Sequence, residues 1–423
     1  MVMAVVLLAG QGYAQWPCTE TVFTDVNNTT QPLFCGWIER FSTLGITGGC
    51  SQAPPLFCPE NPVTRGQMAV FLSTAIEIKK PGKVAVVAKS GGDYDNPAAA
   101  MSDLASWCRP ASDTTTPCLV KIMPGEYDIG SSSLQMQNAV DIEGSGVRVT
   151  RIVGTVDSNT SGLVRGAGAE IRDLTVENRG NHAASNAIAI YNDNSWFYIK
   201  NVSATAWGAT NNHYGIYLTG NGITYMDNVS AFAGSGVNGY GIYSNAALVS
   251  MTNVDVYTNP STNSYGLYFY TPDNWIPGIE MSRVNVVARG DMSGNTYSYG
   301  IYNRNFVITM KDVKATAWGG TVYNYGIFNT EAHYGGGRLT LIDVVTDVRD
   351  GSQSFGVFNT NTGGDVTIDH SVVKAVTNSV RNDNVSAKFY VGATKLDGVT
   401  TSGTIKCAGV HDANYNFYAT SCP

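Results

Sequence analysis

Four polar residues near the end of the chain come closest to a catalytic group. They are Asp365, Asp369, His370 and Lys374, and such side chains could transfer protons during cleavage of a polysaccharide. Asp365 and Asp369 can share one face of a strand, but any two strand residues four apart do so. We therefore favour a solvated strand over an active site. The chain contains no Asp-Asp, Asn-Thr-Asp or Gly-His-Gly motif, so we lean against an enzyme, expect no cofactor, and find calcium supported by no motif.

A tyrosine-rich motif, YGIY at 214–217, recurs five more times and offers rings that could hold sugars. Because side chains alternate along a strand, Tyr214 and Ile216 are expected on one side, with Gly215 and Tyr217 on the other. If Ile216 points inward, the second aromatic residue of each motif forms an outer stripe: Tyr217, Tyr243, Tyr268, Tyr302, Phe328 and Phe358. The stripe is a glycan platform, a subunit interface, or simple packing, and we favour packing.

A second theme alternates with the tyrosine motif, and the two recur in phase. It is IRDLTV at 171–176, and its Leu or Val position returns after steps of 25 to 31 residues. The glycine of the tyrosine motif returns after steps of 25 to 34 residues. Such a period with strand composition predicts a solenoid whose strands pair in parallel with their copies in the next coil. We expect about ten coils, each rising by roughly 4.8 Å.

Asn or Asp stands before most of the Leu or Val positions of the second theme. These residues are Asp173, Asn201, Asn228, Asn253, Asp312 and Asp343. Asn and Asp tolerate the left-handed backbone of a sharp bend, and stacked Asn side chains can hydrogen-bond from coil to coil. The pattern predicts a corner of the solenoid at these positions.

The segment that leads into the repeats has its own order of elements. Strands are expected at 84–87 and 118–122, with a helix over 96–107 between them. This order, followed by PGEY at 124–127, resembles the entry to the pectin-lyase-like right-handed parallel β-helix superfamily. The resemblance implies a helix that covers the open edge of the first coil. We expect a mainly β protein, with the β-helix over 84–400 and a disulfide-closed cap over 401–423.

Residues 15–78 predict a small helical module in front of the solenoid. Apolar residues recur at helical spacing from Trp37, and Thr64 with Gln67 forms a capping-box pattern at the start of a second helix. FTDV at 23–26, WIERFSTLGITGGC at 37–50 and NPVTRGQMAVFLSTAI at 61–76 resemble one copy of the S-layer homology module.

The resemblance implies that the module docks to cell-wall polysaccharide. The candidate binding residues are Asp25, Trp37, Thr64 and Arg65, and a guanidinium suits an acidic group on a polymer. The family usually shows three copies that build binding grooves together, whereas this chain shows one. Purely structural packing of the module, on its neighbour or on other subunits, therefore stays open.

The start of the chain and its cysteines indicate export. Residues 1–14, MVMAVVLLAGQGYA, are typical of a secretory signal peptide, and residues 79–83 read as a linker. Eight cysteines in neighbouring sets predict disulfides formed outside the cytoplasm. The expected pairs are Cys50–Cys58, Cys108–Cys118, Cys407–Cys422 and, by elimination, Cys18–Cys35. We expect a secreted protein of the bacterial envelope.

Charge and hydropathy exclude two classes of partner. The net charge is −7 without a basic cluster, which excludes a nucleic-acid footprint, and no apolar run is long enough to span a membrane. The remaining partners are extracellular polysaccharide and copies of the chain itself. Our leading hypothesis is a cell-surface structural or adhesive protein that can form a filament or layer. The alternatives are a polysaccharide lyase or glycosidase, and a non-catalytic glycan-binding protein.

Overall fold

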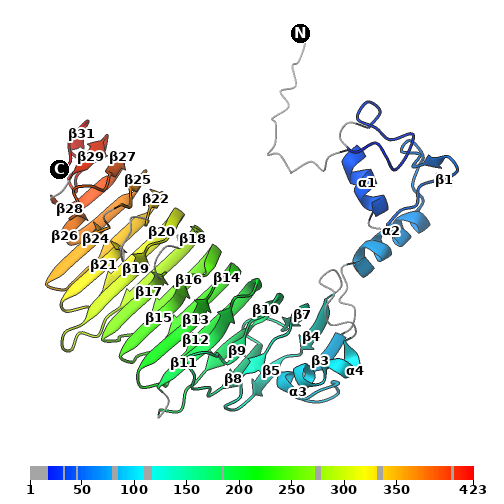
Figure 1. Cartoon of the computed structure of the whole chain (residues 1–423), viewed down its shortest axis with the longest axis horizontal. Helices are drawn as coiled ribbons and strands as arrows, with labels where there is room; N and C mark the ends of the chain where they lie inside the picture. Colours follow the sequence, from blue (N-terminus) through cyan, green and yellow to red (C-terminus); the bar gives the residue numbers. More distant parts are fainter. Residues whose placement is uncertain are drawn as a thin grey trace, which may run out of the picture. The chain divides into compact units, whose positions relative to one another are not determined.

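The computed structural model divides into two compact units, Met1–Pro81 and Gly82–Pro423. It describes residues 18–31, 34–43, 46–78, 84–108, 117–182, 185–271, 278–330, 337–361, 363–401 and 404–423. The predicted signal peptide at 1–14 and the predicted linker at 79–83 lie outside these described residues. Figure 1 labels the helices and strands of both units.

The first unit contains two helices and a short hairpin. Its elements are α1 (Cys35–Thr43), β1 (Ser51–Gln52), β2 (Pro55–Leu56) and α2 (Arg65–Ile78). Its small buried core is made by Phe23, Val26 and Cys35. The capping box before α2 is confirmed, because the Gln67 N–H donates to the Thr64 hydroxyl and the Thr64 N–H donates to the Gln67 side chain.

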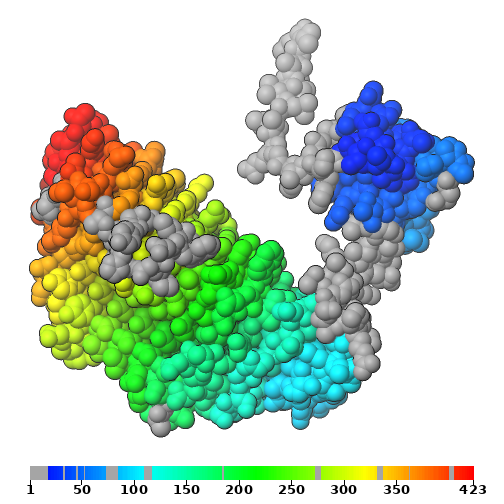
Figure 2. Space-filling model, in the orientation of Figure 1, coloured from blue at the N-terminus to red at the C-terminus, as the bar shows by residue number. Residues whose placement is uncertain are grey.

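The second unit is a right-handed parallel β-helix of about ten coils, as the repeats predict. Each coil contributes to three rows of strands, which we name rows A, B and C. Six long strands run through rows A and B: β10 (Ala169–Asn178), β12 (Phe197–Ala206), β14 (Ile223–Ala233), β16 (Leu248–Thr258), β18 (Gly278–Arg289) and β20 (Val307–Trp318). Figures 1 and 2 show the coils following one another from cyan to red.

Shorter strands complete the three rows at both ends of the solenoid. Row A also holds β3 (Val84–Val87), β4 (Cys118–Ile122), β7 (Val140–Glu143), β22 (Leu339–Ile342), β25 (Val366–Asp369), β27 (Phe389–Gly392) and β29 (Ile405–Ala408). Row B also holds β5 (Gly125–Asp128), β8 (Thr150–Gly154), β23 (Val345–Val348), β26 (Val372–Asn382), β28 (Lys395–Thr401) and β30 (Val410–His411). Row C holds β6 (Leu134–Gln135), β9 (Val164–Arg165), β11 (Asn186–Asp193), β13 (Asn212–Thr219), β15 (Asn238–Asn245), β17 (Asn263–Tyr270), β19 (Tyr297–Arg304), β21 (Tyr323–Thr330) and β24 (Gln353–Asn359). The second half of β26 pairs with β24 and continues row C.

The corner between rows A and B is where the Asn and Asp residues predicted it. All six predicted corner residues have φ between 50° and 57°. Asn201 donates to the Asp173 carboxylate over 2.5 Å, and Asn228 donates to the Asn201 amide over 2.9 Å. The coil-to-coil Asn ladder is therefore confirmed at this corner, where it joins the bends of successive coils.

Both ends of the solenoid are covered by other parts of the chain. At the first coil, the predicted helix is two short pieces, α3 (Pro97–Ser102) and α4 (Leu104–Trp107), and the Asn96 side chain accepts from the Ala98 N–H. Beyond residue 400, β29 and β30 continue rows A and B, and β30 forms an antiparallel hairpin with β31 (Phe417–Tyr418). This hairpin closes the last coil.

Four disulfides tie the chain locally, and they are the four pairs expected from the sequence. They join Cys18 to Cys35, Cys50 to Cys58, Cys108 to Cys118, and Cys407 to Cys422. Disulfides persist in oxidising compartments, so they indicate a protein outside the cytoplasm. Among the described residues, no helix is long and apolar enough to cross a bilayer.

Candidate functional site

The four residues suggested as a catalytic group do not converge. Asp369 contacts His370, with 3.0 Å between the carboxylate and Nδ1, and both side chains are exposed. Asp365 accepts the backbone N–H of Lys388, and Lys374 lies in row B between Asp347 and Asp397. Asp365 therefore binds the main chain, and Lys374 lies in a different row from Asp369. Of the four candidates, only Asp369 and His370 contact each other, as an exposed pair at the corner.

The expected alternation along the tyrosine motif is wrong by one residue. Ile216 and Leu218 are buried, while Tyr214 and Tyr217 are both only half-buried and lie 5.0 Å apart. The glycine between them is buried, and it is skipped in the pairing register of neighbouring strands. At Gly241 a Cβ would come within 2.1 Å of Val256 Cγ1. Because glycine has no side chain, row C can lie this close to row B. The tyrosines on both sides of the glycine then face outward, and in successive coils they form two parallel columns of rings, which we name the double row.

The double row contains the predicted stripe and a row that the alternation missed. The first row is Tyr214, Tyr240, Tyr265, Tyr299, Tyr325 and Phe355. The second row is the predicted stripe of Tyr217, Tyr243, Tyr268, Tyr302, Phe328 and Phe358. Phe358 is buried rather than outward-exposed, beneath the Arg381 guanidinium at 4.9 Å.

Neighbouring rings in the double row cover each other's faces. Tyr268 stacks on Tyr243 and Tyr302 at centroid distances of 5.0 and 4.5 Å, and it meets Tyr265 edge to face. Burial raises the pKa of Tyr265 to about 12, so its hydroxyl stays protonated. A sugar ring stacks on a free aromatic face, and these faces are already occupied. The double row is therefore a packed ladder that joins successive coils.

Open aromatic faces occur instead on the outer surface of row A. Trp196 is 62% exposed, Tyr198 is 43% exposed and Tyr225 is 37% exposed. Tyr198 and Tyr225 stack at 4.8 Å in successive coils, and the column of side chains continues with Glu170 before them and Ser250 after them. Since neither Glu170 nor Ser250 carries a ring, the stack ends after two residues. Each tyrosine thus keeps one face that no further ring covers.

These three rings lie in a line of adjoining hollows that we name the row A groove. Its first hollow, of about 740 Å³, runs from Pro117 past Gly168 to Trp196 and Tyr198. The second, of about 500 Å³, shares Glu170 and Tyr198 with the first and also holds Lys200. The third, of about 370 Å³, shares Tyr225 and Ser250 with the second and reaches Thr309 on β20. The first hollow is lined by small residues such as Gly168 and Ala169 on one side and by the rings of Trp196 and Tyr198 on the other.

A charge cluster forms part of the wall of the first hollow. Arg172 Nη1 lies 3.6 Å from the Asp141 carboxylate and 3.3 Å from the Glu170 carboxylate. Arg172 also pairs with Glu143 at 2.6 Å, and Lys121 pairs with Glu143 as well. Burial raises the pKa of Asp141 despite the nearby guanidinium, and the charge of Glu170 adds to this shift. The carboxyl group of Asp141 therefore holds its proton more tightly than an ordinary aspartic acid.

The sequence carried a signal for these residues that the search for motifs missed. The second theme begins with an inward residue, Ile171, Ile199 or Met226, and the residue before it must face outward. Those outward positions are Glu170, Tyr198 and Tyr225. If the copies of the second theme are aligned to include the residue before the first inward position, Tyr198 and Tyr225 occupy the same column. That this pair borders hollows depends on small residues in other coils, which no local pattern shows.

In the first unit, two of the four wall-binding candidates serve the fold. The Asp25 carboxylate accepts the backbone N–H groups of Phe57 and Cys58, and Thr64 caps α2. Arg65 is exposed at the start of α2. Trp37 is 42% exposed and lines a hollow of about 350 Å³ with Phe34 and Phe41. Trp37 is therefore the candidate with both an open ring and a concave surface.

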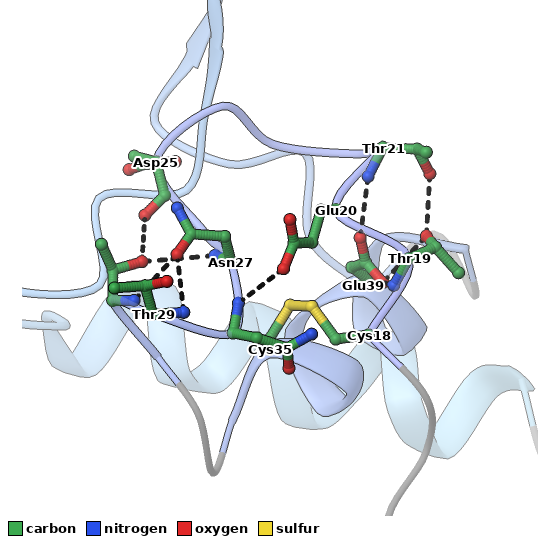
Figure 3. Close-up of a disulfide and its surroundings, with 11 residues drawn as sticks. Cys18, Thr19, Glu20, Thr21, Asp25, Asn27, Thr29, Cys35 and Glu39 are labelled. Atoms are coloured by element: carbon green, nitrogen blue, oxygen red, sulfur yellow. Dashed lines mark hydrogen bonds between the residues drawn. A yellow bond between two sulfur atoms is a disulfide. The ribbon is translucent and has the colours of Figure 1, made fainter.

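One group in the first unit has metal-ligand residue types, namely Cys18, Cys35 and Glu39. Figure 3 shows that the two sulfurs form a disulfide, which removes them as thiolate ligands. The Glu39 carboxylate accepts the backbone N–H groups of Thr19 and Thr21. Burial opposes ionisation of Glu39, but these hydrogen bonds outweigh it and lower its pKa. The disulfide and these hydrogen bonds therefore connect residues 18–21 to α1, which is a structural role.

No family model matches the chain, and no curated protein sequence matches it. Among solved structures, the A-module of the Azotobacter vinelandii mannuronan C-5 epimerase AlgE6 aligns with 75% of this chain and 95% of its own, at 15% identity and a TM-score of 0.41. The catalytic domain of a GH87 alpha-1,3-glucanase aligns with 79% of this chain and 65% of its own, at 13% identity and a TM-score of 0.47. A pectin methylesterase from carrot aligns with 68% of this chain and 88% of its own, at 18% identity and a TM-score of 0.38. Values this low assign no function to the chain.

Proposed function

We propose that this chain is a secreted, cell-surface protein that binds polysaccharide in the row A groove. The observation that carries the proposal is the position of Trp196, Tyr198 and Tyr225 beside three adjoining hollows. Aromatic side chains in clefts are well suited to ligand binding, since they add contact area with few rotatable bonds. A groove that crosses several coils suits a polymer better than a small molecule.

Binding by the groove is tested with the full chain and two matched variants. Trp196→Ala and Tyr225→Ala remove exposed rings of the groove, whereas Tyr268→Ala removes a ring of the double row. On a panel of polysaccharides and hexasaccharides, we expect at least tenfold weaker binding for the two groove variants and unchanged binding for the Tyr268 variant. Equal loss in all three variants, or no binding by the unmodified chain, would refute the proposal.

A polysaccharide-cleaving enzyme is the second candidate, and Asp141 is the observation that favours it. A carboxyl with a raised pKa beside the carboxylate of Glu170 is an arrangement that can supply an acid and a base. New reducing or unsaturated ends from a polysaccharide panel would support cleavage. Asp141→Asn should then abolish the activity, and Asp369→Asn should leave it intact. A panel without products would leave the groove as a binding surface.

We also propose that the first unit is the S-layer-homology-like module that attaches the protein to the cell wall. Its support is the motif pattern together with the hollow at Trp37. Co-sedimentation of the full chain with purified cell walls tests this attachment, and Trp37→Ala should release the protein. Assembly into a filament or layer remains a prediction that electron microscopy can test. Since α3 and the C-terminal hairpin cover the solenoid ends, such assembly would need other contacts.

A further inference from the structure

The described residues that line the first hollow include acidic side chains and no basic one. The acidic ones are Asp141 and Glu170. Two cations of the adjoining charge cluster, Lys121 and Arg172, are paired with Glu143, and Arg172 also pairs with Asp141 and Glu170. The cluster therefore holds three carboxyl groups against two cations. Lys200 lines the second hollow, which shares Glu170 and Tyr198 with the first.

A ligand carboxylate in the first hollow would lie beside the carboxyl groups of Asp141 and Glu170, and none of the described lining residues of that hollow is basic. Like charges a few ångströms apart repel each other, and they do so more strongly near a protein surface than in water. A uronic-acid unit would have to overcome this repulsion. A neutral sugar unit would not, because its hydroxyl groups can donate hydrogen bonds to the Glu170 carboxylate, whose side chain is 32% exposed.

The remaining lining of the first hollow suits an uncharged ring. Trp196 and Tyr198 supply exposed aromatic surface for the apolar face of a sugar. The exposed Asn138 is anchored because its side-chain oxygen accepts the Gly168 N–H, and this bond leaves its NH₂ group pointing away from that anchor. A donor amide, an acceptor carboxylate and two rings can therefore contact one hydroxyl-rich unit.

We infer that the row A groove selects neutral polysaccharides and rejects acidic ones at its first hollow. This inference rests on the proposed function, since it assigns the ligand class of the same groove. It concerns only the charge of the bound sugar units. The linkage and the identity of the sugar are separate properties that the shape of the whole groove determines.

The test compares oligosaccharides that differ only in charge. Neutral β-1,4-linked hexasaccharides of glucose, mannose and galactose are paired with counterparts oxidised at C6 to uronic acids, and binding is measured by calorimetry with the full chain. We expect the neutral member that binds most tightly to exceed its acidic counterpart by at least tenfold. The gap should narrow as salt is added, because salt screens repulsion between exposed charges.

Two variants decide whether the first hollow causes the selection. Glu170→Gln keeps the size and hydrogen bonding of the side chain and should narrow the gap between neutral and acidic ligands. Asp397→Asn removes a negative charge in row B near the other end of the solenoid and should leave the gap unchanged. Trp196→Ala should abolish binding of both ligands.

The two proposals fail in different ways. If an acidic hexasaccharide binds as tightly as its neutral counterpart and Trp196→Ala still abolishes binding, the groove binds glycans and the inferred selection is wrong. If Glu170→Gln leaves a tenfold gap unchanged, the carboxylate does not cause the selection and the inference is also wrong. If no oligosaccharide shows binding that depends on Trp196, the proposed function itself fails.

Discussion

His213 and Asn324 make the same hydrogen bond in two coils with similar sequences. Nε2 of His213 accepts the N–H of Ala209 at 2.9 Å, and Oδ1 of Asn324 accepts the N–H of Gly320 at 2.9 Å. Both residues are fully buried and pin a turn by reaching back four residues. The two segments, 204–217 and 315–328, align with each other at an offset of 111 residues. The same hydrogen bond is thus made in both segments, although a histidine accepts it in one and an asparagine in the other.

The two residues differ in how they respond to acid. In the described structure Nδ1 of His213 has no partner, and burial lowers the pKa of His213 to about 4. The unfolded chain binds a proton at His213 near pH 6.5, whereas the folded chain does so only near pH 4. Stability from this site is therefore complete above pH 6.5 and is lost as the pH falls from 6.5 toward 4.

Replacing His213 by Asn tests this pH dependence. We expect His213→Asn to keep the bond to Ala209, as Asn324 does for Gly320, and to remove a loss of roughly 3 kcal/mol between pH 6.5 and 4. Denaturant unfolding at several pH values measures the difference between the variant and the unmodified chain. His213→Ala should lose about 1–3 kcal/mol at pH 7, because a buried N–H loses its acceptor. An unchanged pH slope in His213→Asn would contradict the assignment.

The glycine of the tyrosine motif should tolerate no side chain. Gly241→Ala places a Cβ 2.1 Å from Val256 Cγ1, and we expect a loss of about 1–3 kcal/mol from overpacking. Thermal unfolding followed by circular dichroism measures the loss. The double variant Gly241→Ala, Val256→Ala should be less destabilised than the sum of its two single changes. Gly278→Ala, where a Cβ meets nothing within 4 Å, is the matched control and should be near neutral.

The double row should contribute stability rather than binding. Tyr268 contacts four other rings, Tyr240, Tyr243, Tyr265 and Tyr302. Tyr268→Ala is expected to cost about 3 kcal/mol, since a large aromatic side chain and its ring contacts are lost. Tyr268→Phe should cost less than about 1 kcal/mol because the ring remains. A Tyr268→Ala variant with full stability and lost glycan binding would restore the platform hypothesis.

The C-terminal disulfide should protect the last coil. Cys407 lies in β29, the final strand of row A, and Cys422 lies beyond the hairpin that closes the coil. In the Cys407→Ala, Cys422→Ala variant we expect faster hydrogen exchange over 405–418 and unchanged exchange over 197–258, because each coil contacts only its neighbours. Uniformly faster exchange would mean that the whole solenoid unfolds as one unit instead.

The solenoid could be predicted from the sequence, because every coil repeats the same pattern of residues along the chain. The phase of the two themes predicted parallel rows, and Asn201 and Asn228 marked the corner, since few other residues accept its positive φ. The clustering of the cysteines along the chain also predicted three of the pairs, and the fourth, Cys18–Cys35, followed by elimination. These features are local or repeat from coil to coil, so a single sequence contains them.

Which side chains face outward together could be learned only from the folded chain. Strict alternation predicted that Tyr214 and Ile216 point to the same side of the strand. In the structure Ile216 is buried, whereas Tyr214 and Tyr217 are both half-buried on the outer side. In the next copy of the motif, Gly241 lies so close to Val256 that it leaves no room for a side chain. The tertiary structure also showed that neighbouring rings of the double row stack on one another and that Trp196 and Tyr198 border a hollow with Glu170. Rings and carboxylates from different coils meet through the stacking of the coils. Their distances in space, unlike their period, are absent from the order of residues.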